Sequence, residues 1–422
     1  MNITLAPSGR LSGRVKCPPS KSYTIRAVTA GLLAKGVSTI KDPLFSADTK
    51  ACINVSKKFG ARIEKSASSL KISGVAGKPK TPKTVLDTLN SGTTIRIMTA
   101  VSALCGNRVS LTGDESIQKR PIEPLLDSLR QLGVKASSRN GCPPVTVEGP
   151  LRGGVCSIRG DVSSQFISGL LMALPCVRED SVVNVKGELK SKPYVDLTLD
   201  ILSKFGVEVE NKNYSQFNIP GNQTYKSTLY TVEGDYSSAA FILAAAALTE
   251  SKVTVSNLFK DSKQADKKFV SILKEMGVDI HADGDSVTVK GSGILSGIDV
   301  DLSDSPDLLP ITSVVCSLAG GESKIYNVAH ARLKECDRIK AMYTELRKMG
   351  ASIVEKPDGL EITGRKLKGA FVNGWHDHRI VMSLAVAGLR AIGKTTITDK
   401  EFIDVTFPNF IEMMKKIGAK IN

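Results

Sequence analysis

The sequence predicts an α+β fold of two similar domains, each made of three β-α-β-α-β-β repeats with the helices packed inside. Three observations lead to this prediction. One short phrase ends six helical runs at a nearly constant period. Helix-like and strand-like patterns alternate within each period, and one helix of each repeat is apolar on nearly every side.

The recurring phrase is a hydrophobic residue, a glycine, and then a small or β-branched residue. It occurs at Phe59-Gly60-Ala61, Leu132-Gly133-Val134, Phe205-Gly206-Val207, Met276-Gly277-Val278, Met349-Gly350-Ala351 and Ile417-Gly418-Ala419. The period is about 70 residues, and a fixed period indicates one supersecondary unit used six times. Each glycine follows an amphipathic run, where a left-handed residue that ends a helix is expected.

Within each period the pattern is an apolar helix, a short strand, the amphipathic helix that ends at the glycine, and two further strands. First helices such as FILAAAAL and VMSLAVAGL are apolar all round, which predicts burial in the middle of a domain. The sixth unit stops at Ile421-Asn422, short of its last strand. We expect the N-terminal run ITLAP to supply that strand, so that the two ends of the chain meet.

The domain organisation follows from the repeat count and the length. At about 150 residues per domain, 422 residues make two or three domains. Six units divide most simply into two domains of three, with the second crossover near residues 220–232. We therefore expect residues 15–227 to carry repeats 1–3, and residues 1–14 plus 228–422 to carry repeats 4–6.

The composition excludes several classes of function. No N-terminal signal segment or membrane-spanning run is present, and the eight cysteines include no CxxC pair, which predicts reduced thiols and a cytoplasmic location. The net charge is +15, but the lysines are dispersed and only 5% of residues are aromatic. These features disfavour a nucleic-acid partner. Small anionic substrates account for the charge as well.

Unusual residues occupy the starts of the first helices. They are Ser20-Lys21-Ser22 with Arg26, Asn90 to Thr93 with Arg96, Ser163-Ser164-Gln165, Asp235 to Ser238, Ser305-Pro306-Asp307, and His376 to Arg379. Ser, Asn and Asp are ordinary helix caps. Cations in a first turn are disfavoured by the helix dipole. The four that occur here therefore indicate a bound anion that compensates them: Lys21, Arg26, Arg96 and Arg379.

Some second helices begin in the same way, at Lys119-Arg120-Pro121, Ser191 to Tyr194, and Lys334 to Arg338. Any one of these segments could be a solvated charged face. Their recurrence at equivalent repeat positions favours a cleft between the two domains that takes substrates with several negative charges. Asp307 and Glu335 stand among the cations and are candidates for proton transfer.

Two further motifs have weaker interpretations. Residues 388–395 match the pattern of a phosphate-binding P-loop, but that motif needs a strand before the loop and a helix after it, and here the order is reversed. His376 and His378 beside Asp377 could ligate a metal. With four histidines in the chain and no further cluster, a metal site is the weaker option.

Taken together, the motifs are similar to those of the enolpyruvyl transferases, and among them to the enzymes that act on shikimate-3-phosphate. The matching segments span essentially the whole chain: PPSKSYTIR, LNSGTTIR, IQKRPIEPLL, DVSSQF, SKPYVDLTL, VEGDYSSAAF, SPDLLPIT, RLKECDRI, HDHRIVMSLAV and TFPNF. The resemblance implies the enolpyruvyl transferase fold, with the active site in the cleft between the domains. It also implies a monomer that needs no cofactor and no metal, binds neither nucleic acid nor membrane, and is a target of glyphosate.

The resemblance further implies the site residues. Shikimate-3-phosphate would be held by Lys21, Ser22, Arg26, Ser163, Ser164, Gln165, Ser191, Tyr194, Asp307 and Lys334. Phosphoenolpyruvate would be held by Lys21, Gly92, Arg120, Gln165, Arg338 and Arg379. Asp307 would take the proton of the 5-hydroxyl, Glu335 would deliver a proton to C3 of phosphoenolpyruvate, and Lys21 would lie close to the bridging oxygen. The chain departs from the family's pattern at Ile97, His330 and Val405, where Pro, Asn and Lys are common.

Three alternatives stay open at this point. A sister enzyme that uses UDP-N-acetylglucosamine shares the fold, but it carries a reactive cysteine in a loop near the Arg120 region, and SIQKRPIEP has none. RNA 3′-phosphate cyclase is a distant relative in fold, and its histidine site has no clear match. A nucleic-acid-binding protein would explain the charge but not Asp307 and Glu335 among the cations.

Overall fold

The computed structural model describes all 422 residues and divides them into two compact units. Domain I comprises Met1–Pro18 and Glu233–Asn422, and domain II comprises Pro19–Val232. Both boundaries lie a few residues beyond the expected 14/15 and 227/228. The reason is strand pairing: β2 (Ser12–Lys16) pairs with β15 (Lys252–Ser256) in domain I, and β14 (Leu229–Thr231) pairs with β3 (Val37–Lys41) in domain II.

Domain II contains three four-stranded sheets, one for each repeat. Their orders are β14-β3-β5-β4, β6-β7-β9-β8 and β10-β11-β13-β12. The remaining strands are β4 (Arg62–Lys65), β5 (Ser69–Ser73), β6 (Leu86–Asp87), β7 (Arg108–Thr112), β8 (Lys135–Arg139), β9 (Cys142–Glu148), β10 (Gly154–Arg159), β11 (Ser181–Lys186), β12 (Glu210–Lys212) and β13 (Gln216–Ile219). In each sheet the first two strands are parallel and the later pairs are antiparallel, for example β6 with β7 and β7 with β9.

Domain I repeats this topology with the orders β16-β17-β15-β2, β18-β19-β21-β20 and β1-β23-β22. Its further strands are β1 (Ile3–Leu5), β16 (Asp279–Asp283), β17 (Ser286–Lys290), β18 (Asp299–Asp301), β19 (Glu322–Tyr326), β20 (Ser352–Lys356), β21 (Gly359–Thr363), β22 (Phe371–Val372) and β23 (Thr395–Ile397). β1 lies antiparallel to β23, and the backbones of Thr4 and Asn422 exchange hydrogen bonds of 2.9 and 2.8 Å. The predicted meeting of the chain ends is therefore confirmed.

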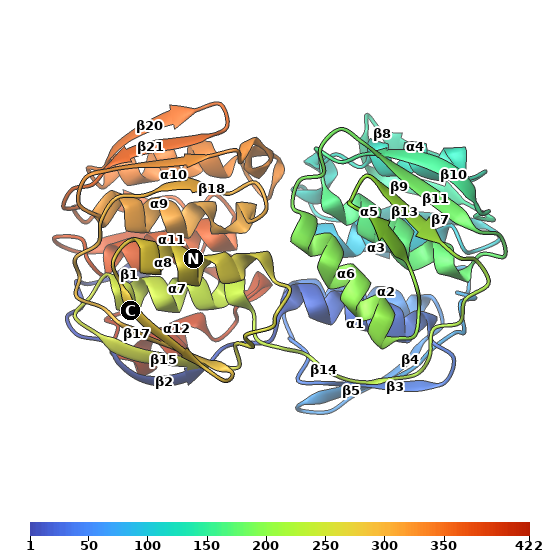
Figure 1. Ribbon diagram of the computed structural model, residues 1–422, viewed down its shortest axis with the longest axis horizontal. Helices are drawn as coiled ribbons and strands as arrows, with labels where there is room; N and C mark the ends of the chain where they lie inside the picture. Colours follow the sequence, from blue (N-terminus) through green and yellow to red (C-terminus); the bar gives the residue numbers. More distant parts are fainter. The chain divides into compact units, whose positions relative to one another are not determined.

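The first helix of each repeat lies inside its domain. These helices are α1 (Lys21–Leu33), α3 (Gly92–Ser102), α5 (Ser164–Ala173), α7 (Tyr236–Ala247), α9 (Leu309–Leu318) and α11 (His378–Gly388). Every residue of α3, α7 and α11 is buried. Figure 1 shows α7, α9 and α11 in the middle of domain I with β15, β17, β20 and β21 at its edges. The predicted packing of helices inside the domains is confirmed.

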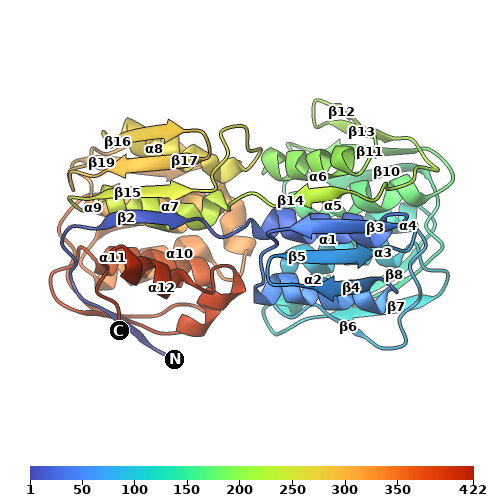
Figure 2. The ribbon, with the colours of Figure 1, turned by 90° about the horizontal axis from the view of Figure 1, so that it is seen from below.

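The second helices are amphipathic and end at the repeated glycines. They are α2 (Ala47–Lys58), α4 (Glu123–Gln131), α6 (Lys192–Lys204), α8 (Lys268–Glu275), α10 (Arg338–Lys348) and α12 (Phe410–Lys416). Figure 2 shows β3 with β5 in the first repeat and β15 with β2 in the fourth, each pair lying in front of the helices of its own domain. The order β-α-β-α-β-β is thus present in the first five repeats, with the first strand of repeats 1 and 4 supplied across a domain crossover. The sixth repeat has a three-stranded sheet in which β1 supplies the last strand, and Ile421 forms only an isolated bridge with Leu5.

The repeated glycines end their helices in the same geometry. Gly60 has φ 105°, its N–H donates to the Lys57 carbonyl at 3.0 Å, and the Ala61 N–H donates to the Ser56 carbonyl at 3.2 Å. The other five glycines have positive φ and the same pair of bonds. This is a Schellman cap, and the left-handed conformation it needs explains why glycine recurs.

Replacing Gly277 by alanine should isolate the backbone contribution to one of these caps. Gly277 has φ 92° and no atom lies within 4 Å of the position that a Cβ would take, so the cost is conformational. We expect the unfolding free energy to fall by about 1 kcal/mol. Urea and thermal denaturation measure the change. Gly9→Ala is the matched control in domain I, since Gly9 has equal space and does not adopt a positive φ; equal midpoints for the two variants would contradict the explanation.

Three other sequence features have clear outcomes. Residues 388–395 run from the end of α11 into β23, so a helix precedes the turn and a strand follows it, and the P-loop interpretation fails. All eight cysteines are free thiols. None of the helices has both the length and the apolar character that crossing a membrane requires.

Candidate active site

In domain II the predicted residues gather at helix N-termini. The hydroxyls of Ser20, Ser91 and Ser163 cap α1, α3 and α5 by accepting from the backbone N–H groups of the first turns, at 3.3 to 3.4 Å. Ser191 caps α6 with a left-handed backbone of φ 57°. The first three caps follow ordinary rules, and the four helix starts determine the positions of the neighbouring residues Lys21, Ser164, Gln165 and Tyr194.

Lys21 is ion-paired within domain II. Its Nζ lies 3.1 Å from Oδ2 of Asp48, and the two side chains are 12% and 4% exposed. Asp48 lies in the first turn of α2. Asp48 could not be recognised from the sequence, because an aspartate at a helix start is an ordinary dipole partner and nothing in the sequence shows which cation it faces.

Arg26 is buried at 1% exposure and joins three helices. Its Nε donates to the Thr198 hydroxyl at 2.8 Å, and its Nη1 and Nη2 donate to the carbonyls of Ser22 at 3.1 Å and Tyr194 at 3.0 Å. Burial lowers its pKa to about 10, and the Tyr194 and Tyr23 side chains oppose that effect. Arg26 remains a cation at neutral pH, and it holds the backbones of Ser22 and Tyr194 in place.

Two arginines converge on Gly92 at the start of α3. Arg96 donates from Nη1 to Oε1 of Gln165 at 2.6 Å, and Arg120 donates from Nη2 to the Ser116 hydroxyl at 2.8 Å and to Oδ1 of Asn90 at 3.2 Å. A Cβ on Gly92 would lie 2.9 Å from Nη1 of Arg120 and 3.4 Å from Nη1 of Arg96. The absence of a side chain at Gly92 therefore lets both guanidinium groups approach the helix start.

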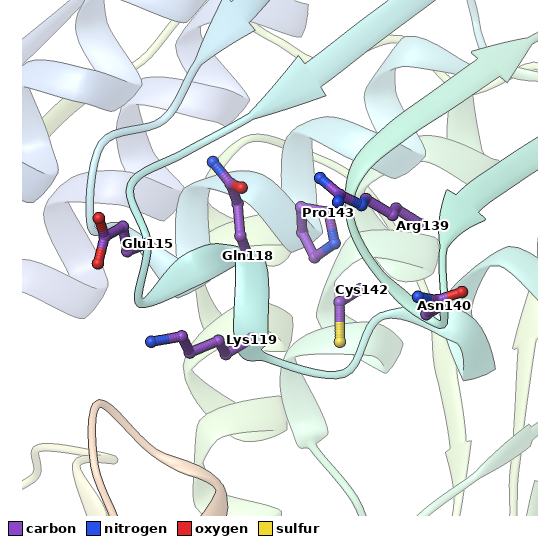
Figure 3. Close-up of a pocket in the computed structure, with 7 residues that line it drawn as sticks. All are labelled: Glu115, Gln118, Lys119, Arg139, Asn140, Cys142 and Pro143. Atoms are coloured by element: carbon purple, nitrogen blue, oxygen red, sulfur yellow. The ribbon is translucent and has the colours of Figure 1, made fainter.

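Lys119, which precedes Arg120, lies in a separate pocket, away from the start of α3. It belongs to a 3₁₀ turn, η1 (Ile117–Lys119), and lines a pocket of about 310 Å³ together with Glu115, Gln118, Arg139, Asn140, Cys142 and Pro143. Figure 3 shows Gln118 and Lys119 on one side of this pocket and the residues of the β8–β9 hairpin on the other. The pocket contains none of the predicted substrate-binding residues. Burial raises the pKa of the Cys142 thiol and Arg96 opposes it, so this nearby cysteine is not an activated thiolate.

In domain I the two predicted proton-transfer residues share one arginine. Asp307 lies on a 3₁₀ turn, η4 (Pro306–Leu308), and its Oδ1 is 2.7 Å from Nη1 of Arg338. Glu335 places Oε2 at 2.6 Å from Nη2 of Arg338. Asp307 also lies 2.9 Å from Nη2 of Arg379 and 3.7 Å from Nζ of Lys334. The structure thus brings all five predicted residues of domain I into one cluster.

Asp377 completes this cluster, whereas the sequence indicated for it only a place in a helix start and a weak metal interpretation. Its carboxylate accepts from Nε of Arg338 at 2.7 Å and from the backbone N–H of Arg379 at 2.8 Å, and it is fully buried. Burial lowers the pKa of Arg338, but Asp377, Glu335 and Asp307 outweigh that effect and raise it. As the N-cap of α11, Asp377 looks in sequence like any other capping aspartate.

The two histidines beside Asp377 face different carboxylates. His376 is 73% exposed with Nδ1 at 3.5 Å from Asp399, whereas His378 is 1% exposed with Nδ1 at 3.8 Å from Asp377. No three metal-ligating side chains of the chain come together as a metal site. Of the family departures, Ile97 and Val405 are buried and His330 lies in a 3₁₀ turn, η5 (Ala329–Leu333). Val405 therefore offers no cation.

Comparisons with known proteins identify the family and the fold. A family model described as EPSP synthase (3-phosphoshikimate 1-carboxyvinyltransferase) matches residues 5–414. The 3-phosphoshikimate 1-carboxyvinyltransferases of Methanocaldococcus jannaschii and Methanococcoides burtonii are each 49% identical, over 99% and 100% of this chain and 99% of each relative. The solved structure of EPSP synthase from Acinetobacter baumannii superposes with a TM-score of 0.85 at 28% identity, covering 100% of this chain and 99% of that one. The chain belongs to the EPSP synthase family and has its two-domain enolpyruvyl transferase fold.

Proposed function

We propose that this protein transfers the enolpyruvyl group of phosphoenolpyruvate to the 5-hydroxyl of shikimate-3-phosphate and releases phosphate. The reaction belongs to the shikimate pathway, which leads to chorismate and the aromatic amino acids. One observation carries the proposal: two carboxylates, Asp307 and Glu335, are paired with a single buried arginine, Arg338, beside two further cations. Proton transfer and anion binding both need such groups.

We assign the binding of shikimate-3-phosphate to the serine-rich helix starts of domain II. The proposed ligands are Lys21, Ser22, Arg26, Ser163, Ser164, Gln165, Ser191 and Tyr194, with Asp307 and Lys334 from domain I. Helix N-termini with hydroxyls and a lysine suit a phosphate. Arg26 donates to the carbonyls of Ser22 and Tyr194, and these bonds hold the starts of α1 and α6 in a fixed position relative to each other. This supports the assignment, because both helix starts carry proposed ligands.

We assign the binding of phosphoenolpyruvate mainly to arginines. Its proposed ligands are Lys21, Gly92, Arg120, Gln165, Arg338 and Arg379. Guanidinium groups bind carboxylate and phosphate through paired hydrogen bonds. The close approach of Arg120 to Gly92 supports a phosphate or carboxylate site at the start of α3. The proposal requires residues of both domains to act on one pair of substrates.

The reaction proceeds by addition and then elimination. Asp307 takes the proton of the 5-hydroxyl as its oxygen bonds to C2 of phosphoenolpyruvate, and Glu335 delivers a proton to C3, which becomes a methyl group. The Glu335 carboxylate left by this step then takes back one proton from C3 as the C2–O bond to phosphate breaks, which restores the double bond and releases phosphate, with Lys21 beside the bridging oxygen. Because Glu335 is ion-paired with Arg338, a substrate anion that binds Arg338 competes with that carboxylate and frees it to take up a proton.

We also propose an oligomeric state and a cellular location. The chain acts as a monomer in the cytoplasm, without a cofactor, a nucleic-acid partner or a membrane. The eight free thiols support a reducing compartment. The net charge of +15 attracts small polyanions.

Phosphate release tests the proposal against its rivals. We expect release only when shikimate-3-phosphate and phosphoenolpyruvate are both present, with one phosphate per enolpyruvyl product. UDP-N-acetylglucosamine in place of shikimate-3-phosphate should give none. Release with UDP-N-acetylglucosamine alone as acceptor, or no release with either acceptor, would overturn the proposed function.

Gly92→Ala should weaken phosphoenolpyruvate binding more than it slows turnover. The new Cβ would stand 2.9 Å from Nη1 of Arg120, a distance that forces the guanidinium to move. We expect the KM for phosphoenolpyruvate to rise about tenfold or more, and inhibition by the longer anion glyphosate to weaken further. Initial-rate measurements at several phosphoenolpyruvate concentrations check this. Gly106→Ala, where a Cβ meets nothing within 4 Å, is the control; equal KM values in both variants would count against the assignment.

A further inference from the structure

Asp266 is a buried carboxyl group of domain I that has no part in the mechanism proposed above. It lies on a 3₁₀ turn, η3 (Ala265–Lys267), directly before α8, and is 1% exposed. The Ser237 hydroxyl donates to its Oδ2. Its Oδ1 is buried and has no hydrogen-bond partner. A buried carboxyl oxygen without a partner is costly, so its retention calls for an explanation.

The turn that carries Asp266 is tied to the proposed active site on two sides. The Ser305 hydroxyl, two residues before Asp307, donates to the carbonyl of Ala265 at 3.1 Å. Gln264 donates from Nε2 to the carbonyl of Gly234 at 2.7 Å and accepts from the N–H of Tyr236 at 3.1 Å. Asp266 is therefore held rigidly between the turn of Asp307 and the start of α7.

The charges around Asp266 come from three other elements. Asp235 caps α7, Asp307 lies on η4, and Arg379 lies in the first turn of α11. Asp307 and Asp235 disfavour a negative charge on Asp266, whereas Arg379 favours it. On its own side, Lys267 and Lys268 are directed to the carbonyls of Lys260 and Asp301. Burial is the largest effect, and it acts with Asp307 to raise the pKa of Asp266 to about 7.

We propose that Asp266 is a positioning residue whose charge sets how strongly Arg379 binds the phosphoenolpyruvate anion. When Asp266 is protonated, it adds no negative charge to the ion pair of Arg379 with Asp307. When Asp266 ionises, a second negative charge competes for Arg379 and repels the incoming anion. Phosphoenolpyruvate binding therefore weakens as the pH rises through the ionisation of Asp266. The inference rests on the proposed function for the identity of the anion.

Asp266→Asn tests the effect on substrate binding, because asparagine has the same shape, stays neutral and still accepts from Ser237. The ratio of the wild-type KM for phosphoenolpyruvate to that of the variant cancels the ionisation of the substrate itself. We expect this ratio to be near one at pH 6 and to rise about tenfold by pH 8.5. Asp261→Asn, an exposed aspartate in the preceding loop, is the control and should give a flat ratio. A flat ratio for Asp266→Asn in folded protein overturns the proposal.

Ser237→Ala provides an independent variant. The hydroxyl of Ser237 stabilises the ionised carboxylate, so its removal should move the midpoint of the wild-type KM profile to higher pH. A structural role alone would not shift that midpoint. An unchanged midpoint contradicts the proposal, even if Asp266→Asn fails to fold.

A measurement that needs no turnover separates this inference from the proposed function. Carbon-13 NMR of protein labelled at the aspartate carboxyl carbons, with Asp266→Asn to assign the resonance, follows the ionisation of Asp266 directly. We expect a midpoint near 7. A midpoint near 4, the ordinary value for aspartate, overturns the inference whether or not the enzyme turns over.

Discussion

Asp307→Asn should lower kcat by about 10²–10⁴-fold while folding and substrate binding persist. Asparagine fits the same space but cannot accept the proton of the 5-hydroxyl. The carboxylate contacts Arg338 at 2.7 Å and Arg379 at 2.9 Å, and its neutralisation removes one negative charge that competes with the substrate anion for these two cations. Binding of phosphoenolpyruvate should therefore be unchanged or tighter.

Steady-state phosphate release gives kcat, and calorimetry gives the affinity for shikimate-3-phosphate. Asp299→Asn is a matched control, because Asp299 is exposed on β18 in the same repeat and should leave kcat unchanged. If Asp307→Asn turned over at the wild-type rate, Asp307 would not be the base.

Arg338→Ala should have the largest effect on stability of any single change in the proposed site. Arg338 is 1% exposed and pairs with Asp307, Glu335 and Asp377 at 2.6 to 2.7 Å. Its removal leaves three carboxylates close together with little solvent. Breaking a buried pair of this kind costs about 3–5 kcal/mol, and turnover should be lost because both proposed proton-transfer groups lose their partner.

Arg332→Ala is the matched comparison. Arg332 also pairs with two carboxylates at 2.7 Å, Asp337 and Glu355, but its side chain is 24% exposed. We expect a loss of about 1 kcal/mol or less for this variant. Thermal and urea denaturation of both variants measure the difference. Equal losses would show that the burial of Arg338 does not have the importance assigned to it.

The repeat architecture could be predicted because its signals are local. A left-handed C′ residue requires glycine, so six glycines at a fixed period identify six helix ends, and the structure places all six in that conformation. The domain boundaries were displaced by a few residues for a non-local reason. β2 and β14 pair with strands far away in sequence, and short strands carry no mark of their partners.

The same distinction holds for the candidate site. Cations at helix starts stand out in the sequence because the helix dipole disfavours them, and the structure brings Arg338, Arg379 and Lys334 to Asp307 as expected. Asp48, Asp377 and Asp266 could not be recognised, because an aspartate at a helix start is also an ordinary cap. Only tertiary structure shows that Asp48 faces Lys21 and that Asp377 faces Arg338.

Isotope transfer from the solvent tests whether the reaction proceeds by addition and elimination with Glu335 as the acid. The reaction is run in D₂O with shikimate-3-phosphate and phosphoenolpyruvate, and the product and recovered substrate are analysed by proton NMR and mass spectrometry. With the wild-type protein we expect deuterium at C3 of the enolpyruvyl group, because C3 passes through a methyl group. With Glu335→Gln we expect no product and no exchange of deuterium into recovered phosphoenolpyruvate. Product that forms without deuterium at C3 would contradict the account.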